Sequence, residues 1–163
     1  MIRRLRLPMV VMPVWLVVMS CAMPPVAEPD RLTDTFPEAQ AELRAAVDTI
    51  ARDVMTGNID GLQAMHLPSD KFSKFGPRRF DRQDVASTNA SEAAYFSSLS
   101  NVTYEARDLK VDVFGEVAVV TYYPQVTFVR DGEPGGGSGR QTLVFLRTTD
   151  GWRIVHEHGT PVF

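Results

Sequence analysis

The chain has 163 residues, of which 44% are hydrophobic and 23% charged, and its formal net charge is −3. This length suits one domain that buries most of its apolar surface without disulfide bonds. A mildly acidic chain with scattered Lys and Arg lacks the basic footprint of a nucleic-acid-binding protein, so we expect no nucleic-acid partner. The single cysteine, Cys21, excludes an intramolecular disulfide and a multi-cysteine metal cluster.

Residues 1–20 have the three parts of a secretory signal peptide: a start with three arginines, an apolar stretch over 7–19, and small residues at Ser20 and Ala22. The apolar stretch is short for a membrane span and contains two prolines. Residues 18–21 (VMSC) resemble a lipobox, which predicts cleavage before Cys21 and lipidation of its thiol. Ordinary cleavage after Ala22 is the alternative.

The lipobox interpretation predicts an exported lipoprotein at the periplasmic face of the outer membrane, since Ala22 and not Asp follows the cysteine. Contact with the membrane would then be through the lipid anchor only. A soluble periplasmic or secreted protein is the alternative. Residues 21–34 comprise the lipidated cysteine and a Pro-rich tether that we expect to be disordered, and 35–163 form the domain.

The first half of the domain has helical periodicity. A capping-box spacing over 35–38, with Pro37 in the first turn, predicts a helix that continues to Val54 and ends at Gly57. A second short helix is predicted over 60–67 and a short strand around 72–75. A second capping-box spacing, beginning at Asn89, predicts a third helix that continues to Leu99.

After Asn101 the period of the apolar residues changes from about 3.6 to 2, which predicts four strands over 102–113, 117–130, 141–147 and 152–158. A change of phase near Arg107 and Asp108 predicts a β-bulge. The glycine-rich run 135–139 lacks the lysine and helix of a phosphate-binding loop, so it is predicted to be a flexible loop between strands. The element order predicts an α+β fold, in which a curved, mostly antiparallel sheet wraps on about three N-terminal helices.

Two motifs at opposite ends of this order resemble one superfamily. Residues 57–62 (GNIDGL) are similar to the junction between the first two helices of nuclear transport factor two-like proteins, and 150–158 (DGWRIVHEH) are similar to their closing strand. The resemblance covers 37–162 and is to the SnoaL-like and ketosteroid-isomerase-like domains. It implies a cone-shaped, cystatin-like α+β roll around an apolar pocket, and a homodimer formed through the sheet.

Aromatic residues are first of all candidates for the core, and some of them must line any pocket. Which face of the last two strands turns inward stays open, because both faces are apolar. The candidate lining residues are Phe72, Phe75, Tyr95, Phe96, Tyr104, Tyr122, Phe145 and Trp152, with His156 and His158 as polar groups.

The resemblance also implies where isomerase chemistry would be found. Ketosteroid isomerases use a carboxylate base and a hydrogen-bond donor pair, but the matching positions here are Ile50 and 74–76, which contain no acid. This speaks against isomerase chemistry, although Asp108 or Asp112 could point inward.

His156 and His158 project from one face of a strand, as a metal-binding pair would. A third ligand, such as His66 or an Asp, would have to come from elsewhere, and Glu157 points the other way. We therefore expect structural or pocket-lining histidines, no metal and no cofactor.

Three functions are compatible with these observations. The first is an exported, lipid-anchored domain that binds a hydrophobic or mixed small molecule. The second is a SnoaL-like enzyme of the isomerase, cyclase or dehydratase type, using general acid/base catalysis on a carbonyl substrate. The third is a structural oligomerisation module. A titratable pair inside the pocket would favour the second, and a pocket filled by side chains would favour the third.

Overall fold

The computed structural model describes residues 30–77 and 79–162, and the predicted leader and Cys21 lie outside the described residues. Three helices and five strands form the described part. In chain order they are α1 (Pro37–Thr56), α2 (Ile59–Met65), β1 (Ser73–Phe75), α3 (Val85–Phe96), β2 (Ser100–Phe114), β3 (Val117–Arg130), β4 (Glu133–Thr148) and β5 (Gly151–Val162).

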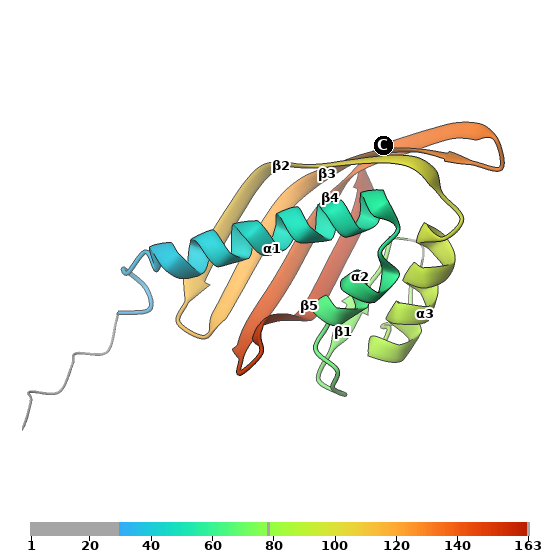
Figure 1. Cartoon of the computed structure of the whole chain (residues 1–163). Coiled ribbons are helices and arrows are strands. Elements are labelled where there is room, and N and C mark those ends of the chain that lie inside the picture. Colours follow the sequence, from blue (N-terminus) through green and yellow to red (C-terminus); the bar gives the residue numbers. More distant parts are fainter. Residues whose placement is uncertain (1–29, 78, 163) are drawn as a thin grey trace, which may run out of the picture.

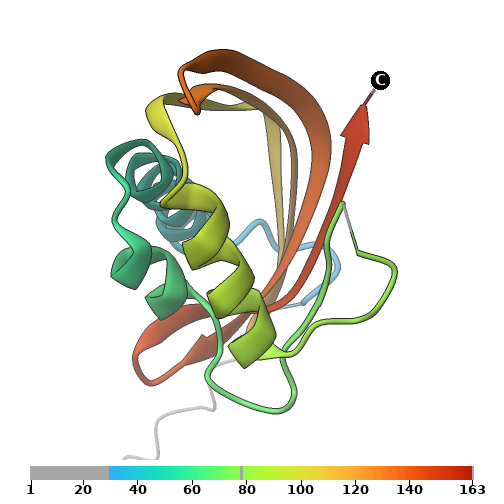
Figure 2. The ribbon, with the colours of Figure 1, turned by 90° about the vertical axis from the view of Figure 1, so that its right-hand side faces the viewer.

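The five strands form one sheet in the order β1-β5-β4-β3-β2. All neighbours are antiparallel except β1 and β5, which run parallel. The sheet curves strongly, and the three helices lie on its concave side (Figures 1 and 2). The predicted α+β class, with a curved and mostly antiparallel sheet on three helices, is confirmed.

The predicted start of α1 at Pro37 is confirmed, although the capping box expected there does not form, and the predicted start of α3 is wrong. At α1, Phe36 precedes the helix in a left-handed conformation (φ 47°) and no side chain caps it, so Pro37 in the first turn is the remaining start signal. Helix α3 begins at Val85, four residues before the predicted capping box, because the Asp84 carboxylate accepts the Ser87 N–H at 2.8 Å. Asn89 instead lies inside the helix.

The bulge predicted in β2 is confirmed by a register shift between Arg107 and Lys110, where Asp108 has a φ of 52°. The flexible loop predicted over 135–139 is wrong. Those residues belong to β4, and the turn lies at 131–132. Gly135 faces Phe128, and a Cβ at Gly135 would lie 2.6 Å from the phenyl ring, so any larger residue there would have to displace that ring.

The hydrophobic core lies between α1 and the concave face of the sheet. Leu43 and Val47 of α1 are fully buried with Val120, Leu143 and Phe145 of β3 and β4. At the beginning of the described residues, 31–33 form a turn in which the Asp30 carboxylate accepts the Leu32 N–H at 3.0 Å. Among residues 30–77 and 79–162, no helix is long and apolar enough to cross a membrane.

Trp152 joins the closing strand to α1. Its indole N–H donates to Glu42 Oε2 at 2.8 Å, and the Arg147 guanidinium lies 4.6 Å from the ring centroid. The side chain is 6% exposed. One residue thus combines apolar burial, a hydrogen bond to a helix and a cation–π contact.

Truncating this side chain should cost much of the domain's stability. We expect Trp152→Ala to lower the free energy of unfolding by about 3–5 kcal/mol, because the cavity left behind cannot fully close. Chemical denaturation followed by circular dichroism measures this. Phe114→Ala is the control, since Phe114 is 40% exposed. An equally small decrease in the free energy of unfolding in both variants would contradict the anchoring role of Trp152.

Candidate functional site

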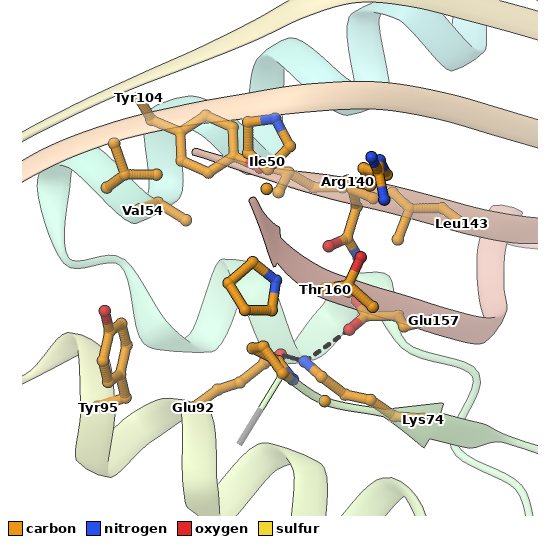
Figure 3. Close-up of a pocket in the computed structure, with 18 of the residues that line it drawn as sticks. Ile50, Val54, Lys74, Glu92, Tyr95, Tyr104, Arg140, Leu143, Glu157 and Thr160 are labelled. Atoms are coloured by element: carbon orange, nitrogen blue, oxygen red, sulfur yellow. Dashed lines mark hydrogen bonds and ion pairs between the residues drawn. The ribbon is translucent and has the colours of Figure 1, made fainter. Parts of the chain in front are cut away.

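A cavity of about 700 Å³ lies between the helices and the concave face of the sheet (Figure 3). Most of its wall is apolar, from α1, α2, α3 and the four long strands. The apolar and aromatic lining residues include Ile50, Val54, Leu62, Met65, Tyr95, Phe96, Tyr104, Tyr122, Val126, Phe128, Leu143 and Ile154.

Four titratable side chains gather at one end of the cavity, and we call them the floor cluster: His66, Lys74, Glu92 and Glu157. They come from four places in the chain, namely the residue after α2, β1, α3 and β5. None of the four side chains is more than 15% exposed. The parallel pairing of β1 with β5 sets Lys74 directly beside Glu157 in the sheet.

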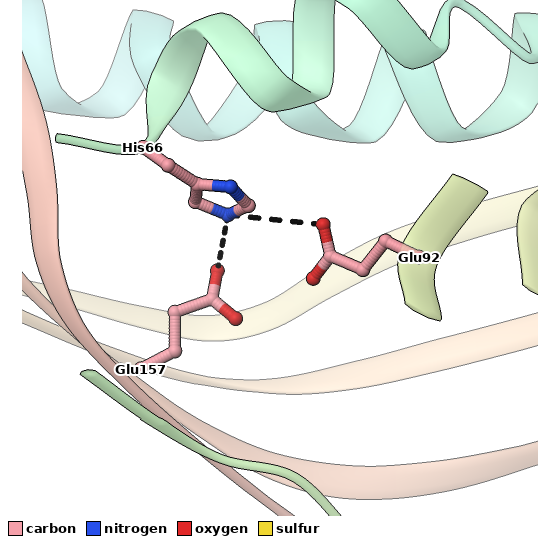
Figure 4. Close-up of side chains that lie close together, drawn as sticks. All are labelled: His66, Glu92 and Glu157. Carbon is pink, nitrogen blue, oxygen red and sulfur yellow. Dashed lines mark hydrogen bonds and ion pairs between the residues drawn. The ribbon is translucent and has the colours of Figure 1, made fainter. Parts of the chain in front are cut away.

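Lys74 lies between the two carboxylates. Its Nζ is 2.6 Å from Glu157 Oε2 and also forms an ion pair with Glu92 Oε1. His66 Nε2 faces the same two acids, 3.3 Å from Glu157 Oε1 and 3.7 Å from Glu92 Oε2 (Figure 4). Two anions therefore share one ammonium and one imidazole in a place from which water is mostly removed.

Asn89 fixes the orientation of the imidazole. Its Oδ1 lies 2.7 Å from His66 Nδ1, which as an N–H donates to it, so Nε2 is directed at the acids. Phe72 packs on the ring, with centroids 4.9 Å apart. An uncharged His66 with its proton on Nδ1 would turn a lone pair toward two carboxylates, so this geometry favours the imidazolium.

Burial and the neighbouring carboxylates have opposite effects on the pKa values of His66 and Lys74. Burial lowers the pKa of His66, but the hydrogen bond and charge of Glu157 and the charge of Glu92 outweigh it, and the pKa is raised. Burial likewise disfavours the Lys74 ammonium, yet Glu157 and Glu92 raise its pKa.

The two carboxyls of the floor cluster are shifted in opposite directions. Burial raises the pKa of Glu157, but Lys74 and His66 overcome this and lower it to about 2. Burial, reinforced by the nearby Glu157 charge, raises the pKa of Glu92 despite Lys74. Glu92 is therefore the carboxyl of this pair that more readily takes up a proton.

His66, Glu92 and Glu157 also offer three ligand atoms within 4.8 Å of one another, a set that could hold a metal ion. Lys74 Nζ already lies against both carboxylates. A metal ion would have to displace this ammonium, so the arrangement fits an internal ion-pair network better than a metal centre.

A second polar group lies among the lining residues on β2 and β3. The hydroxyls of Tyr104 and Tyr122 are 3.0 Å apart. Burial raises the pKa of Tyr104 to about 12 and that of Tyr122 well above its usual value, so both stay protonated. One hydroxyl donates its hydrogen to the oxygen of the other, and the hydrogen of the accepting hydroxyl can be donated to a ligand.

Of the ten residues predicted to line the pocket, four line this cavity: Tyr95, Phe96, Tyr104 and Tyr122. Phe72, Phe145 and Trp152 lie in the hydrophobic core instead. The remaining three, Phe75, His156 and His158, lie together elsewhere, with ring centroids 5.8 and 6.0 Å from Phe75 to the two histidines.

A bulge in β5 explains the misplaced histidines. His156 pairs with Val144 and Ile154 pairs with Phe145, so Val155 is an extra residue in β5. Trp152 and Ile154 face the core, and the extra residue brings Glu157 to that face in place of His156. His156 instead contacts Ser73, with Nδ1 2.9 Å from the hydroxyl oxygen.

The sequence interpretation therefore missed the floor cluster. The sequence pattern indicates His66 only as a third metal ligand and places Glu157 on the face opposite to that of the two histidines, and it gives no functional signal at Glu92. Ile50 and Lys74, which match the catalytic positions of ketosteroid isomerases, line the cavity. Asp108 and Asp112, the acids that could have pointed inward, do not line it. A signal was present in Lys74, since a lysine in a short strand next to apolar residues needs acidic partners when it is buried.

Comparison of the chain with known proteins shows the family to which its sequence belongs. The family model described as SnoaL-like domain matches residues 43–163. No curated protein matches the chain. Solved structures show the same fold at low sequence identity.

The chain is similar to a nuclear transport factor 2-like superfamily protein from Salmonella enterica, with a TM-score of 0.71, 19% identity, and coverage of 78% of this chain and 93% of that one. It is similar to an NTF2-like protein with a cystatin-like fold from Novosphingobium aromaticivorans, with a TM-score of 0.62, 17% identity, and coverage of 77% and 83%. For the CaMKII hub homology domain of Chlamydomonas reinhardtii the TM-score is 0.63, the identity 22%, and the coverage 77% and 99%.

The raised pKa of His66 predicts how stability changes with pH. The stabilisation from a protonated His66 is fully present below the usual pKa of 6.5 and is lost as the pH rises through the higher folded-state pKa. We expect the melting temperature to fall between pH 6 and pH 9, and to fall less in His66→Gln. His158→Gln is the control, because His158 is exposed and on the other face of β5. If the melting temperature of His66→Gln fell as much as that of the unchanged protein, a charged His66 in the floor cluster would be contradicted.

Proposed function

The chain belongs to the SnoaL-like domain family, and we propose that it binds a small, mainly apolar molecule that carries a polar group. The observation that supports this is the cavity of about 700 Å³ with an apolar wall and one buried polar end. Cavities of this size and composition are typical of small-molecule sites. A purely structural oligomerisation module would fill this space with side chains.

The polar groups of the cavity can orient a ligand. Lys74 has three ammonium hydrogens and two carboxylate partners, so a third N–H remains for a ligand. The Tyr104–Tyr122 pair supplies one more donor. A carbonyl or hydroxyl group of an otherwise apolar molecule fits this set of donors.

Glycines keep the wall of the cavity open. Gly137, Gly139 and Gly159 line it, and a Cβ at Gly139 or Gly159 would come within 3.0 Å of Thr160 O or Gln141 Oε1, respectively. At Gly137 a Cβ would have no heavy atom within 4 Å, so a large side chain there can enter the open space without backbone strain.

Filling the cavity at this point tests ligand binding. We expect the protein to bind the neutral dye Nile red with enhanced fluorescence, and Gly137→Trp to weaken binding about tenfold or more while the circular dichroism spectrum is unchanged. Glu133→Trp, an exposed change in the same strand outside the lining, is the control. Undiminished binding in Gly137→Trp, or no binding by the unchanged protein, would count against the proposal.

A second function is supported by the titratable pair inside the cavity. Glu92 has a raised pKa and lies beside Lys74 and His66, while the tyrosine pair can donate to an oxygen that gains negative charge. We propose that Glu92 can remove a proton next to a ligand carbonyl. The acid comes here from α3, and not from residues 74–76, the positions that match the base of ketosteroid isomerases.

Solvent exchange reports this chemistry without knowledge of the substrate. We expect the protein to speed deuterium incorporation next to the carbonyl of 2-tetralone in heavy water, as followed by proton NMR. Glu92→Gln should lower the rate by a factor of about 10² to 10⁴, the usual effect of losing a general base. Glu105→Gln, an exposed change, is the control. Exchange at the uncatalysed rate with the unchanged protein would remove this second function.

We also propose export, lipidation at Cys21 and a homodimer through the convex face of the sheet. The arginine-rich start, apolar stretch and lipobox-like residues 18–21 support the first two. Phe75 and Tyr123 are large aromatic side chains on strands of the sheet that are exposed to solvent, and a second copy of the chain would cover them. Sedimentation of the protein as a monomer at all concentrations would contradict the dimer.

The anchor has a direct test. We expect Cys21→Ser to move the protein from the membrane fraction to the soluble fraction, because the thiol is the acceptor of the lipid. Uptake of labelled palmitate by the unchanged protein, and none by the variant, is the accompanying measurement. A variant that stays in the membrane fraction, together with unlabelled wild-type protein, would show that Cys21 is not an anchor.

A further inference from the structure

The loop between β1 and α3 carries the most exposed aromatic side chain of the described residues. Phe80 is 99% exposed, whereas Tyr123, the next most exposed aromatic residue, is 46% exposed. We call residues 76–77 and 79–82 the Phe80 loop. Single exposed apolar side chains are common on protein surfaces, so the surroundings of Phe80 decide what its exposure means.

The Phe80 loop is fixed at its base. Lys74 and Gln83 exchange two backbone hydrogen bonds, in which the Lys74 N–H donates at 3.0 Å and the Gln83 N–H donates at 2.9 Å. The Gln83 side chain is buried and donates from Nε2 to Ser91 Oγ of α3 at 3.0 Å. The residues between these two strand positions therefore project as a closed loop, and Phe80 lies in its outer part.

The Phe80 loop also forms part of the mouth of the cavity. Pro77 lines the cavity and is exposed, as are Gly137 of β4 and Pro161 of β5. A Cβ at Gly159 would lie 3.8 Å from Pro77, so the loop lies against the last part of β5, as Figure 2 shows. Val162 at that end is 42% exposed. The mouth therefore opens beside an apolar rim that faces solvent.

Two cations flank the exposed phenyl ring. Arg79 and Arg82 are exposed, and in the part of the chain that the structure describes neither forms an ion pair. With two arginines and one acid, Asp81, residues 79–82 are positively charged, although the chain as a whole has a net charge of −3. An apolar ring between basic side chains suits the surface of an anionic bilayer, where the ring leaves water and the cations approach lipid phosphates.

From these observations we infer that the Phe80 loop docks on a membrane that contains anionic lipids, with Phe80 inserted into the interface and Arg79 and Arg82 against the phosphates. The proposed lipid at Cys21 favours a membrane as the partner, because residues 21–29 span at most about 30 Å even when fully extended.

Docking through this loop turns the mouth of the cavity toward the bilayer. An apolar ligand then passes between the bilayer and the cavity without crossing water. This consequence rests on the proposed ligand-binding function, whereas the docking itself does not.

A fluorescent label beside Phe80 reports docking directly. The full chain with Cys21→Ser has no acceptor for a lipid, and Asp81→Cys then supplies its single thiol for a nitrobenzoxadiazole label, whose emission rises in apolar surroundings. We expect emission to rise with vesicles of equal parts phosphatidylglycerol and phosphatidylcholine, and to rise less with phosphatidylcholine alone. Because the label reports only its own surroundings, binding of residues 1–20 to the vesicles gives no signal.

The same label at an exposed position of α1 is the control. Asp48→Cys in the Cys21→Ser chain removes the same charge as Asp81→Cys, but it places the label outside the Phe80 loop. We expect no change in its emission when vesicles are added.

Loss of the phenyl ring tests its insertion. In the chain labelled at position 81, we expect Phe80→Ser to raise the lipid concentration at half-maximal signal about tenfold, because no phenyl ring then leaves water. Leu32→Ser is the matched control, since Leu32 is 86% exposed and lies outside the loop. It should leave that lipid concentration unchanged.

Loss of the two arginines tests the contact with anionic lipids. We expect Arg79→Gln/Arg82→Gln to raise the same lipid concentration about tenfold or more, and added salt to weaken docking of the unchanged loop. Arg44→Gln/Arg52→Gln removes the same charge from exposed positions of α1 and should have little effect.

Four results would overturn the docking inference. They are no response of the label at position 81 to anionic vesicles, an equal response of the label at position 48, a response that survives Phe80→Ser, and a response without vesicles that grows with protein concentration. The last would mean that a second copy of the chain covers Phe80. In each case, continued binding of Nile red would leave the proposed ligand-binding function standing.

Discussion

The burial of Lys74 between Glu92 and Glu157 is the interaction on which the architecture of the site depends. An ammonium removed from water is stable only where carboxylates replace its hydration, and a carboxylate left without its partner would cost several kcal/mol. Lys74 is in β1, Glu92 in α3 and Glu157 in β5, so the ion pairs tie a helix to the parallel edge of the sheet. His66 adds the end of α2 to the same network.

This network explains why the cavity stays open. Charged side chains at its end cannot be covered by apolar neighbours without losing their remaining hydrogen-bonding capacity. On the wall, positions 139 and 159 are glycines, and an added Cβ would meet Thr160 O or the Gln141 amide, respectively. No side chain therefore extends from these two positions into the cavity. The fold thus combines a well-packed core around Phe145 with an unfilled volume beside it.

The same network sets the reactivity of the site. Because Glu157 is held as a carboxylate with a pKa near 2, it keeps Lys74 and His66 protonated and leaves Glu92 as the acid whose pKa rises with burial. The network is close to neutral when His66 is charged and negative when it is not. A ligand therefore meets an apolar wall and a polar end whose charge depends on pH, and these two features together describe an amphipathic ligand.

The sequence by itself determined the element order and the α+β class, because apolar periodicity and turn residues act locally. It placed the bulge at Arg107–Asp108 from a visible change of phase. The bulge at Val155 gives no such signal, since both faces of β5 are apolar, and it decides that Glu157 and not His156 faces the cavity. The third helix start was also hidden, because Asn89, which suits a cap, bonds His66 instead. Only the tertiary structure brought together His66, Lys74, Glu92 and Glu157, which are up to 91 residues apart in the chain, since the pairing of buried charges across a sheet depends on register and packing that local sequence does not encode.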